Sequence, residues 1–102
     1  MVLKRDGRHE EFSREKLISG IRKACQKRPV TPKAMEDLVD HIVATVTVKF
    51  ETEVPGEAIG TMVMDGLREI DSVAYVRYAS VYRRFQEATD FVSEVKKLEA
   101  AR

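Results

Sequence analysis

From residue 13 onward, apolar residues recur every three or four positions, the spacing that gathers them on one face of a helix. The pattern predicts a first helix over residues 14–27, with Ser13 as its N-cap and Pro29 just beyond its end. Its buried face would consist of Leu17, Ile18, Ile21, Ala24 and Cys25.

A second helix is predicted to begin at Thr31-Pro32, where a capping threonine precedes a proline at the first helical position. The tail of this helix, residues 45–50, is rich in β-branched residues, which indicates a short strand there. After a linker over residues 51–56, a third helix follows. It contains Gly60 and Gly66, which we interpret as points of close approach to another helix.

Asp71-Ser72 is predicted to cap one long fourth helix that continues to about residue 98 and ends in a polar tail.

Residues 1–12 show the pattern of a turn between two short strands instead of helical spacing. Asp6-Gly7 between two short flanks is typical of a two-residue β-hairpin turn, and we expect residue 10 to return beside residue 4. A lone hairpin is marginal in water, so it must pack on the helices.

The predicted fold is therefore α+β and mainly helical. A small β-hairpin, with a third short strand as an option, caps a four-helix bundle. At 102 residues the chain is expected to form one domain over residues 1–102.

The net charge of +1 hides an uneven distribution. Residues 1–33 hold ten Lys and Arg against four Asp and Glu, whereas residues 34–76 hold two against nine. Such an asymmetry indicates either a bound anion or two faces that attract each other, including faces of two copies of the chain.

Several classes of protein are disfavoured. No apolar stretch approaches the length of a membrane span, and the N-terminus has no apolar signal region. A single cysteine, Cys25, excludes an internal disulfide and a cysteine-rich zinc site within this chain, which fits a cytoplasmic setting. His9 and His41 have no spaced metal-ligand partners, and no nucleophile–base pair or phosphate-loop motif is present. We therefore expect no enzyme and no metal site.

The first candidate site combines Lys4, Arg5, Glu10 and Lys16. Lys16 lies in the first turn of the predicted first helix, where free amides and cations together bind anions. Glu10 suits a ribose hydroxyl or a base amino group as an acceptor. The simpler alternative is a set of solvated charges on an exposed hairpin.

Tyrosines form the second candidate feature. Tyr78 and Tyr82 are four residues apart and share a helix face, and Tyr75 precedes them. A tyrosine can stack on a nucleotide base or pack in a core with its hydroxyl at the edge. Periodicity alone favours the core.

The residues VLKRDG at 2–7, followed by Glu10 and SREKL at 13–17, resemble the opening of an ATP-cone domain. The segments KRPV at 27–30 and VAYVRYASVYRRF at 73–85 narrow the resemblance to the ATP-cones of the NrdR family of bacterial repressors of ribonucleotide reductase genes. The resemblance extends from Val2 to about Phe91.

The resemblance implies a ligand, ATP or dATP, with magnesium beside its phosphates in some states. It implies that Lys4, Arg5 and Lys16 bind phosphates and that Glu10 contacts the sugar or base. The positions that match the nucleotide-binding set are Val2, Lys4, Arg5, Glu10 and Lys16, with Tyr75 and Tyr82 as further candidates from the fourth helix. The implied function is nucleotide sensing coupled to homo-oligomerisation.

Three departures from the family pattern stand out. Family members carry a four-cysteine zinc ribbon that contacts DNA, and this chain starts just after the point where such a ribbon would end. DNA binding is therefore expected only through a ribbon not present here. Lys49-Phe50 replaces a Thr-Gly type turn, and Gly56 replaces a usual serine, which weakens the cap of the third helix.

Other functions remain open at this point. The chain could be the allosteric ATP-cone of a ribonucleotide reductase, or a helical module that binds a protein partner and no nucleotide. Direct binding of nucleic acid through the basic first third is a weaker alternative, because the acidic middle opposes a polyanion.

Overall fold

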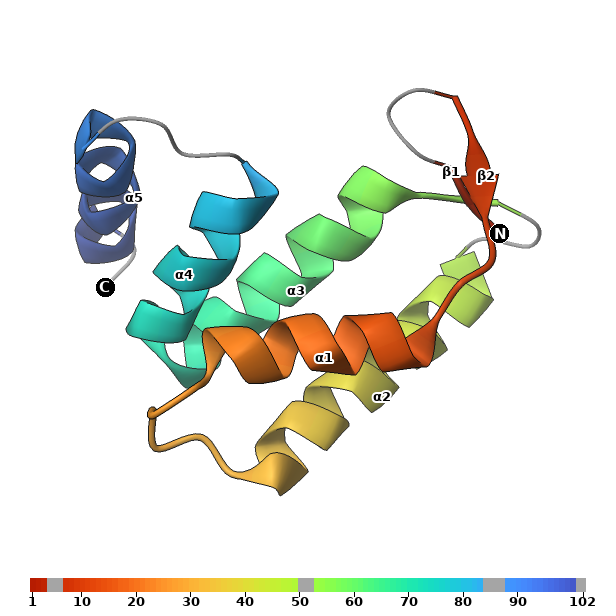
Figure 1. Ribbon diagram of the computed structural model, residues 1–102, viewed down its shortest axis with the longest axis horizontal. Coiled ribbons are helices and arrows are strands. Elements are labelled where there is room, and N and C mark those ends of the chain that lie inside the picture. The colour runs from red at the N-terminus through yellow and green to blue at the C-terminus, as the bar shows by residue number, and fades with distance from the viewer. Residues whose placement is uncertain (4–6, 50–52, 84–87, 101–102) are drawn as a thin grey trace.

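The computed structural model describes residues 1–3, 7–49, 53–83 and 88–100, with side chains from residue 92 in the last range. Within these ranges the chain forms three two-residue strands and five helices (Figure 1). They are β1 (Val2–Leu3), β2 (His9–Glu10), α1 (Arg14–Ala24), α2 (Pro32–Lys49), β3 (Val54–Pro55), α3 (Gly56–Ile70), α4 (Ser72–Tyr82) and α5 (Ala88–Ala100). None of the described helices is long and apolar enough to cross a membrane.

The helices pack around one core, and the small sheet lies at the opposite end of the molecule from α5 (Figure 1). α1 packs on α2 and α4, α3 packs on α2 and α4, and α5 packs on α4. The largest fully buried side chains come from the first four helices: Ile21, Val39, Ile42, Val63, Leu67 and Tyr75. Burial of each is worth about 1.5–3 kcal/mol. The α+β, mainly helical fold is thus confirmed.

The sheet has the strand order β2-β1-β3. β1 pairs antiparallel with β2, and the register places Val2 opposite Glu10. The expectation that residue 10 lies beside residue 4 is therefore wrong. The described pairs of β1 and β2 are Val2 with Glu10 and Leu3 with His9, and Gly7 takes a φ of 85°. Asp6 of the predicted turn lies outside the described residues. Because opposite residues of an antiparallel pair share a face, Val2 and Glu10 face the same side.

A third strand does form, but not where the sequence pattern placed it. α2 continues as helix to Lys49, so the strand expected over residues 45–50 is wrong as far as the described residues go. Thr45 and Thr47 each donate a hydroxyl hydrogen bond to the carbonyl four residues earlier, which keeps them compatible with the helix. The third strand is β3, which pairs parallel with β1.

Two helix ends differ from the prediction. α1 ends at Ala24 rather than near residue 27, because Cys25 caps it and Lys27 adopts a left-handed φ of 59°. The long fourth helix is divided into α4 and α5, with Arg83 as the C-cap of α4. The predicted caps are confirmed: Ser13 accepts from the Lys16 amide, and Asp71 from the Ala74 amide.

Opposite charges of the two chain halves pair within the molecule. Arg14 of α1 contacts Glu36 at 2.8 Å and Asp40 at 2.6 Å, both on α2. Arg28 contacts Asp71 at 3.0 Å, at the junction of α3 and α4. The basic first third and the acidic middle therefore attract each other, at least in part, inside one chain.

Candidate functional site

A cavity of about 250 Å³ lies between the sheet and the helix ends next to it, and we call it the hairpin cavity. Five elements reach it: β1 and β2 from the sheet side, the first turns of α1 and α3, and the last turns of α4. Its lining residues are Val2, Glu10, Glu11, Phe12, Ser13, Lys16, Leu17, Gly56, Ile59, Gly60, Tyr78 and Tyr82.

Four of the predicted site residues line this single cavity: Val2, Glu10, Lys16 and Tyr82. They come from positions up to 80 residues apart in the chain. Val2 is 8% exposed and forms part of the apolar wall. Lys4 and Arg5 lie outside the described residues.

Glu10 and Lys16 face each other across the rim of the cavity. The Lys16 Nζ atom is 3.9 Å from the Glu10 Oε2 atom, and the Lys16 side chain is 80% exposed. A surface pair of this length is weak. The Lys16 ammonium can therefore exchange a carboxylate for the more highly charged phosphates of a ligand at little cost.

The first turn of α1 is arranged for an anion. Ser13 occupies the N-cap with an extended backbone, and its hydroxyl accepts the Lys16 amide at 3.2 Å. The positive end of the helix dipole and the remaining free amides of this turn lie beside the cavity lining formed by Ser13 and Lys16. A polyanion at the rim would meet both.

Two parallel tyrosine rings form the wall of the cavity that α4 supplies. The ring centroids of Tyr78 and Tyr82 are 6.2 Å apart and their planes differ by 17°. Burial raises the pKa of Tyr78, and the neighbouring Tyr82 adds to the effect. The Tyr78 phenol therefore stays protonated at neutral pH, and the pair offers apolar ring surface with hydroxyl groups at its edges.

Each ring lies close to a glycine of a facing helix. A Cβ atom at Gly60 of α3 would stand 2.4 Å from the Tyr82 Cζ atom, and one at Gly20 of α1 would stand 3.6 Å from the Tyr78 Cε2 atom. The interpretation of Gly60 and Gly66 as points of close approach is confirmed, since a Cβ at Gly66 would meet Leu38 at 2.3 Å.

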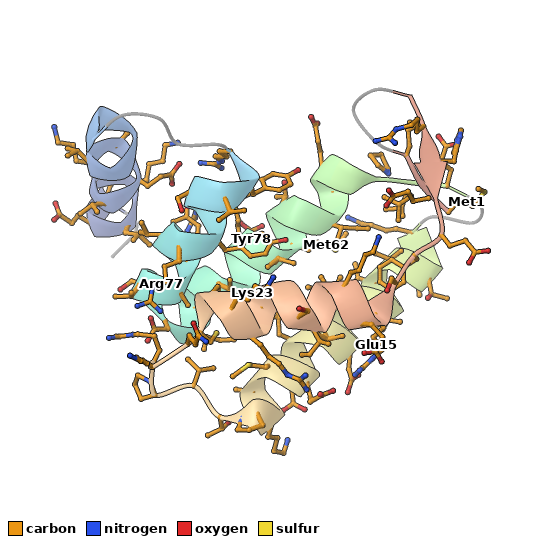
Figure 2. All side chains as sticks on the ribbon, viewed as in Figure 1. Met1, Glu15, Lys23, Met62, Arg77 and Tyr78 are labelled. Carbon is orange, nitrogen blue, oxygen red and sulfur yellow. The ribbon has the colours of Figure 1, made fainter. Side chains whose placement is uncertain are left out.

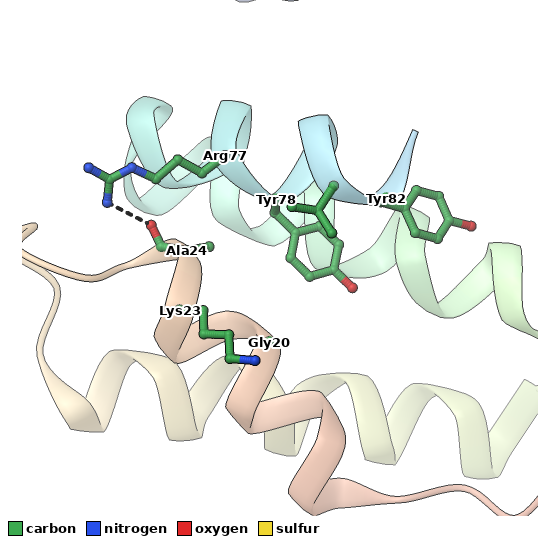
Figure 3. Close-up of a pocket in the computed structure, with 7 residues that line it drawn as sticks. Gly20, Lys23, Ala24, Arg77, Tyr78 and Tyr82 are labelled. Carbon is green, nitrogen blue, oxygen red and sulfur yellow. Dashed lines mark hydrogen bonds between the residues drawn. The ribbon is translucent and has the colours of Figure 1, made fainter. Parts of the chain in front are cut away.

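A second cavity of about 320 Å³ lies on the other side of the tyrosine pair, between α1 and α4 (Figure 3). Lys23 of α1 and Tyr78 of α4 face the space between these helices (Figure 2). Arg77 closes one end, where its guanidinium donates to the carbonyl oxygens of Ala24 and Gln26. Tyr78 and Tyr82 line both cavities.

The structure does not bring Tyr75 to the hairpin cavity. Its side chain is fully buried, and its hydroxyl donates to Glu94 of α5. Tyr78, which the candidate set omitted, lines the cavity instead. At 100° per residue Tyr75 lies about 20° from Tyr82 and Tyr78 about 40° from it, so helix spacing gave no signal for Tyr78. Only the fold shows that Tyr75 lies on the core side.

Metal-binding side chains do not cluster in the part of the chain that the structure describes. His9 is exposed and lies 2.6 Å from a carboxylate oxygen of Glu53. Cys25 is buried, and burial raises the pKa of its thiol.

A comparison with known families identifies the class of protein. Residues 1–88 match the model of the ATP cone domain, so the chain belongs to the ATP-cone family. The match covers every residue that lines the hairpin cavity.

Several proteins that are similar in sequence to this chain share one name. The transcriptional repressor NrdR of Geobacter sulfurreducens is 52% identical over 98 residues, which are 96% of this chain and 65% of that protein. The transcriptional repressors NrdR of Geotalea uraniireducens and Pelotomaculum thermopropionicum are each 49% identical over 98 residues. The chain thus spans about three fifths of the length of these relatives, which are named as regulators of transcription rather than as enzymes.

Proposed function

We propose that this domain binds an adenine nucleotide, ATP or dATP, in the hairpin cavity and reports its presence to the assembly state of the protein. The observation that carries the proposal is the meeting of Val2, Glu10, Lys16 and Tyr82 at one cavity beside the first turn of α1. An apolar wall, an aromatic surface, a carboxylate and a cation at a helix N-terminus match the parts of a nucleotide.

Each residue has a proposed role. The base lies against the Tyr82 ring and Val2, Glu10 accepts from a sugar hydroxyl or a base amino group, and Lys16 binds phosphate at the rim. Lys4 and Arg5 join Lys16 as phosphate ligands in this proposal, on the family resemblance. Magnesium would neutralise phosphate charge there when the nucleotide brings it.

Size supports a ligand that lies partly outside the cavity. About 250 Å³ lies just below the usual range of ligand pockets, roughly 300–1,000 Å³, and suits only the nucleoside part of the molecule. The triphosphate would then extend over the rim, where the exposed Lys16 side chain can follow it.

The wider role of the domain is proposed from the relatives to which the chain is similar. We propose that the domain serves a bacterial, cytoplasmic repressor of the NrdR type, with residues 1–102 as one regulatory domain. Contacts to DNA belong to the remainder of such a protein, a zinc ribbon by the resemblance. Nucleotide can shift an assembly only by binding its states with different affinity.

A partner-binding module without nucleotide is the second candidate, and one observation disfavours it. The charge asymmetry that motivated it is met in part by pairs within the chain, such as Arg14 with Asp40 and Arg28 with Asp71.

The test is calorimetric titration with ATP and with dATP, combined with a mass measurement by light scattering under each condition. We expect saturable binding of both nucleotides and a change in mass with at least one of them. No heat at high micromolar protein would refute the nucleotide assignment. Binding without any change in mass would refute the link to assembly.

A further inference from the structure

α5 presents an unusual face to the rest of the protein. Its side chain Glu94 is 3% exposed, whereas Val92 and Val95 of the same helix are 50% and 43% exposed. A carboxylate is thus buried at the α4–α5 contact while two valines face outward. Burial of a carboxylate is costly unless charged and hydrogen-bonding partners meet it.

Three residues provide such partners for the Glu94 carboxylate. The Tyr75 hydroxyl of α4 donates to its Oε2 atom at 2.5 Å, and Arg83, the C-cap of α4, donates to its Oε1 atom. Lys97 of α5 lies 3.4 Å from Oε1. Burial alone would raise the pKa of Glu94, but the Tyr75 hydrogen bond and the charges of Arg83 and Lys97 together lower it. Glu94 is therefore ionised at neutral pH.

The same cluster continues into α3. Arg68 donates to the Tyr75 hydroxyl at 3.2 Å, and its guanidinium carbon lies 4.9 Å from the centre of the Tyr75 ring. α5 is thus held by polar contacts to α4, and through Tyr75 to α3, in addition to Leu98, which packs against the core. Polar contacts depend on geometry more steeply than apolar packing does.

One end of this cluster adjoins the hairpin cavity. Tyr82 lines the cavity, and the next residue, Arg83, holds Glu94. Tyr82 is the last residue of α4 and Arg83 is its C-cap, whose amide donates to the Ala79 carbonyl at 2.8 Å. A ligand that fixes the Tyr82 ring fixes the turn from which Arg83 reaches α5.

We propose that Glu94 is a positioning residue for the nucleotide site, and that ligand occupancy of the hairpin cavity and docking of α5 stabilise each other through Tyr82 and Arg83. The inference rests on the proposed function. Because coupling free energies are reciprocal, a change confined to α5 must alter affinity at the cavity, and a ligand in the cavity must alter the stability of α5.

The first arm of the test needs no variant. Hydrogen–deuterium exchange of the α5 amides is measured in the wild-type chain with and without saturating ATP. We expect ATP to slow exchange in α5, because bound nucleotide favours the docked helix. A merely structural role for Glu94 predicts no change there, and unchanged exchange in α5 with ATP bound overturns the proposal.

The second arm measures ATP affinity in Glu94→Gln and Tyr75→Phe. Each keeps the shape of its side chain and weakens the cluster, and we expect each to lose about fivefold in affinity, within the usual range of coupling between sites. Glu99→Gln, an exposed change on the same helix, should bind like the wild type. Equal affinity in all four proteins overturns the proposal, as does tighter binding by Glu94→Gln.

The two failures are distinguishable. If the wild-type chain gives no heat with ATP, the proposed function fails and this inference fails with it. If the wild type binds ATP but α5 exchange and the variant affinities do not respond, the nucleotide site stands and only the coupling is refuted.

Discussion

The ring of Tyr82 lies directly over Gly60, so close that a Cβ atom there would stand 2.4 Å from Cζ and 2.8 Å from the hydroxyl oxygen. The glycine allows α4 to bring this ring onto α3 at the wall of the hairpin cavity. The shape of the site therefore depends on a residue that has no functional group of its own.

Gly60→Ala should disturb the ligand site more than the fold. The Tyr82 ring can swing aside, and the helix gains up to about 1 kcal/mol from alanine, so we expect the free energy of unfolding to change little. Nucleotide affinity should fall, because the ring leaves its place in the cavity. Denaturant unfolding and calorimetry measure the two effects.

Gly66→Ala on the same helix is the matched contrast. A Cβ there would meet Leu38 in the core at 2.3 Å, where neighbours leave less room. We expect a loss of about 1–3 kcal/mol in the free energy of unfolding and an unchanged nucleotide affinity of the folded protein. The opposite ranking of the two variants would contradict this account of the cavity wall.

Tyr82 itself should act through its ring. Tyr82→Phe keeps the aromatic surface and should bind ATP within about twofold of the wild type, whereas Tyr82→Ala should lose about tenfold or more, as expected for a lost base stack. Val81→Ala, at an adjacent position that is 80% exposed, serves as the control. Equal affinity of Tyr82→Ala and the wild type would remove Tyr82 from the site.

Acid should destabilise the protein through two buried carboxylates. Burial alone would raise the pKa of Asp71, but the hydrogen bonds from the Ala74 amide and Arg28 lower it below its ordinary 3.8. The pKa of Glu94 likewise lies below its ordinary 4.5. A carboxylate whose pKa is lowered by folding stabilises the folded state at pH values above its ordinary pKa. This stabilisation is lost as the pH falls through the lower pKa of the folded state. Thermal unfolding should therefore shift to lower temperature from about pH 5 downward.

Asp71→Asn isolates one of these groups. An asparagine retains the N-cap acceptor for α4 but cannot titrate, so the variant should be less stable at pH 7 and less sensitive to acid. Asp65→Asn, at an exposed position of α3, should keep the wild-type pH profile. A wild-type profile in Asp71→Asn would show that this carboxylate does not govern the acid response.

Cys25 should be a slow thiol in the native state. It is 3% exposed, and burial, aided by the charge of Asp71, raises the pKa of its thiol. Because the thiolate is the reactive form, a disulfide reagent should label the native protein far more slowly than the unfolded protein. Equally fast labelling with and without denaturant would contradict the burial of this face of α1.

Most of the helical framework could be predicted, because caps and apolar spacing are local signals. Ser13 and Asp71 each cap the helix that follows, and each was visible in the sequence. The division of the last helix into α4 and α5 was not predictable, since apolar spacing continues through it. The buried Glu94 depends on partners from α4 that only the fold brings together.

The residues of the candidate site were predictable only in part. Motif positions gave Val2, Glu10 and Lys16, and the structure brings them to one cavity. Sequence alone could not rank the tyrosines of α4, because the choice between Tyr75 and Tyr78 depends on how α4 is rotated against α1 and α3. The position of Gly20 beneath Tyr78 was likewise visible only in three dimensions.

The most direct test of the central claim is the ATP affinity of Lys16→Gln measured by calorimetry. Lys16 is 80% exposed, so the variant should fold like the wild type, and Lys33→Gln on α2 provides a matched exposed control. We predict that Lys16→Gln binds ATP about tenfold more weakly, or about 1.4 kcal/mol, while Lys33→Gln is unchanged. Equal ATP affinity in the wild type and Lys16→Gln would contradict the assignment of phosphate binding to the hairpin cavity.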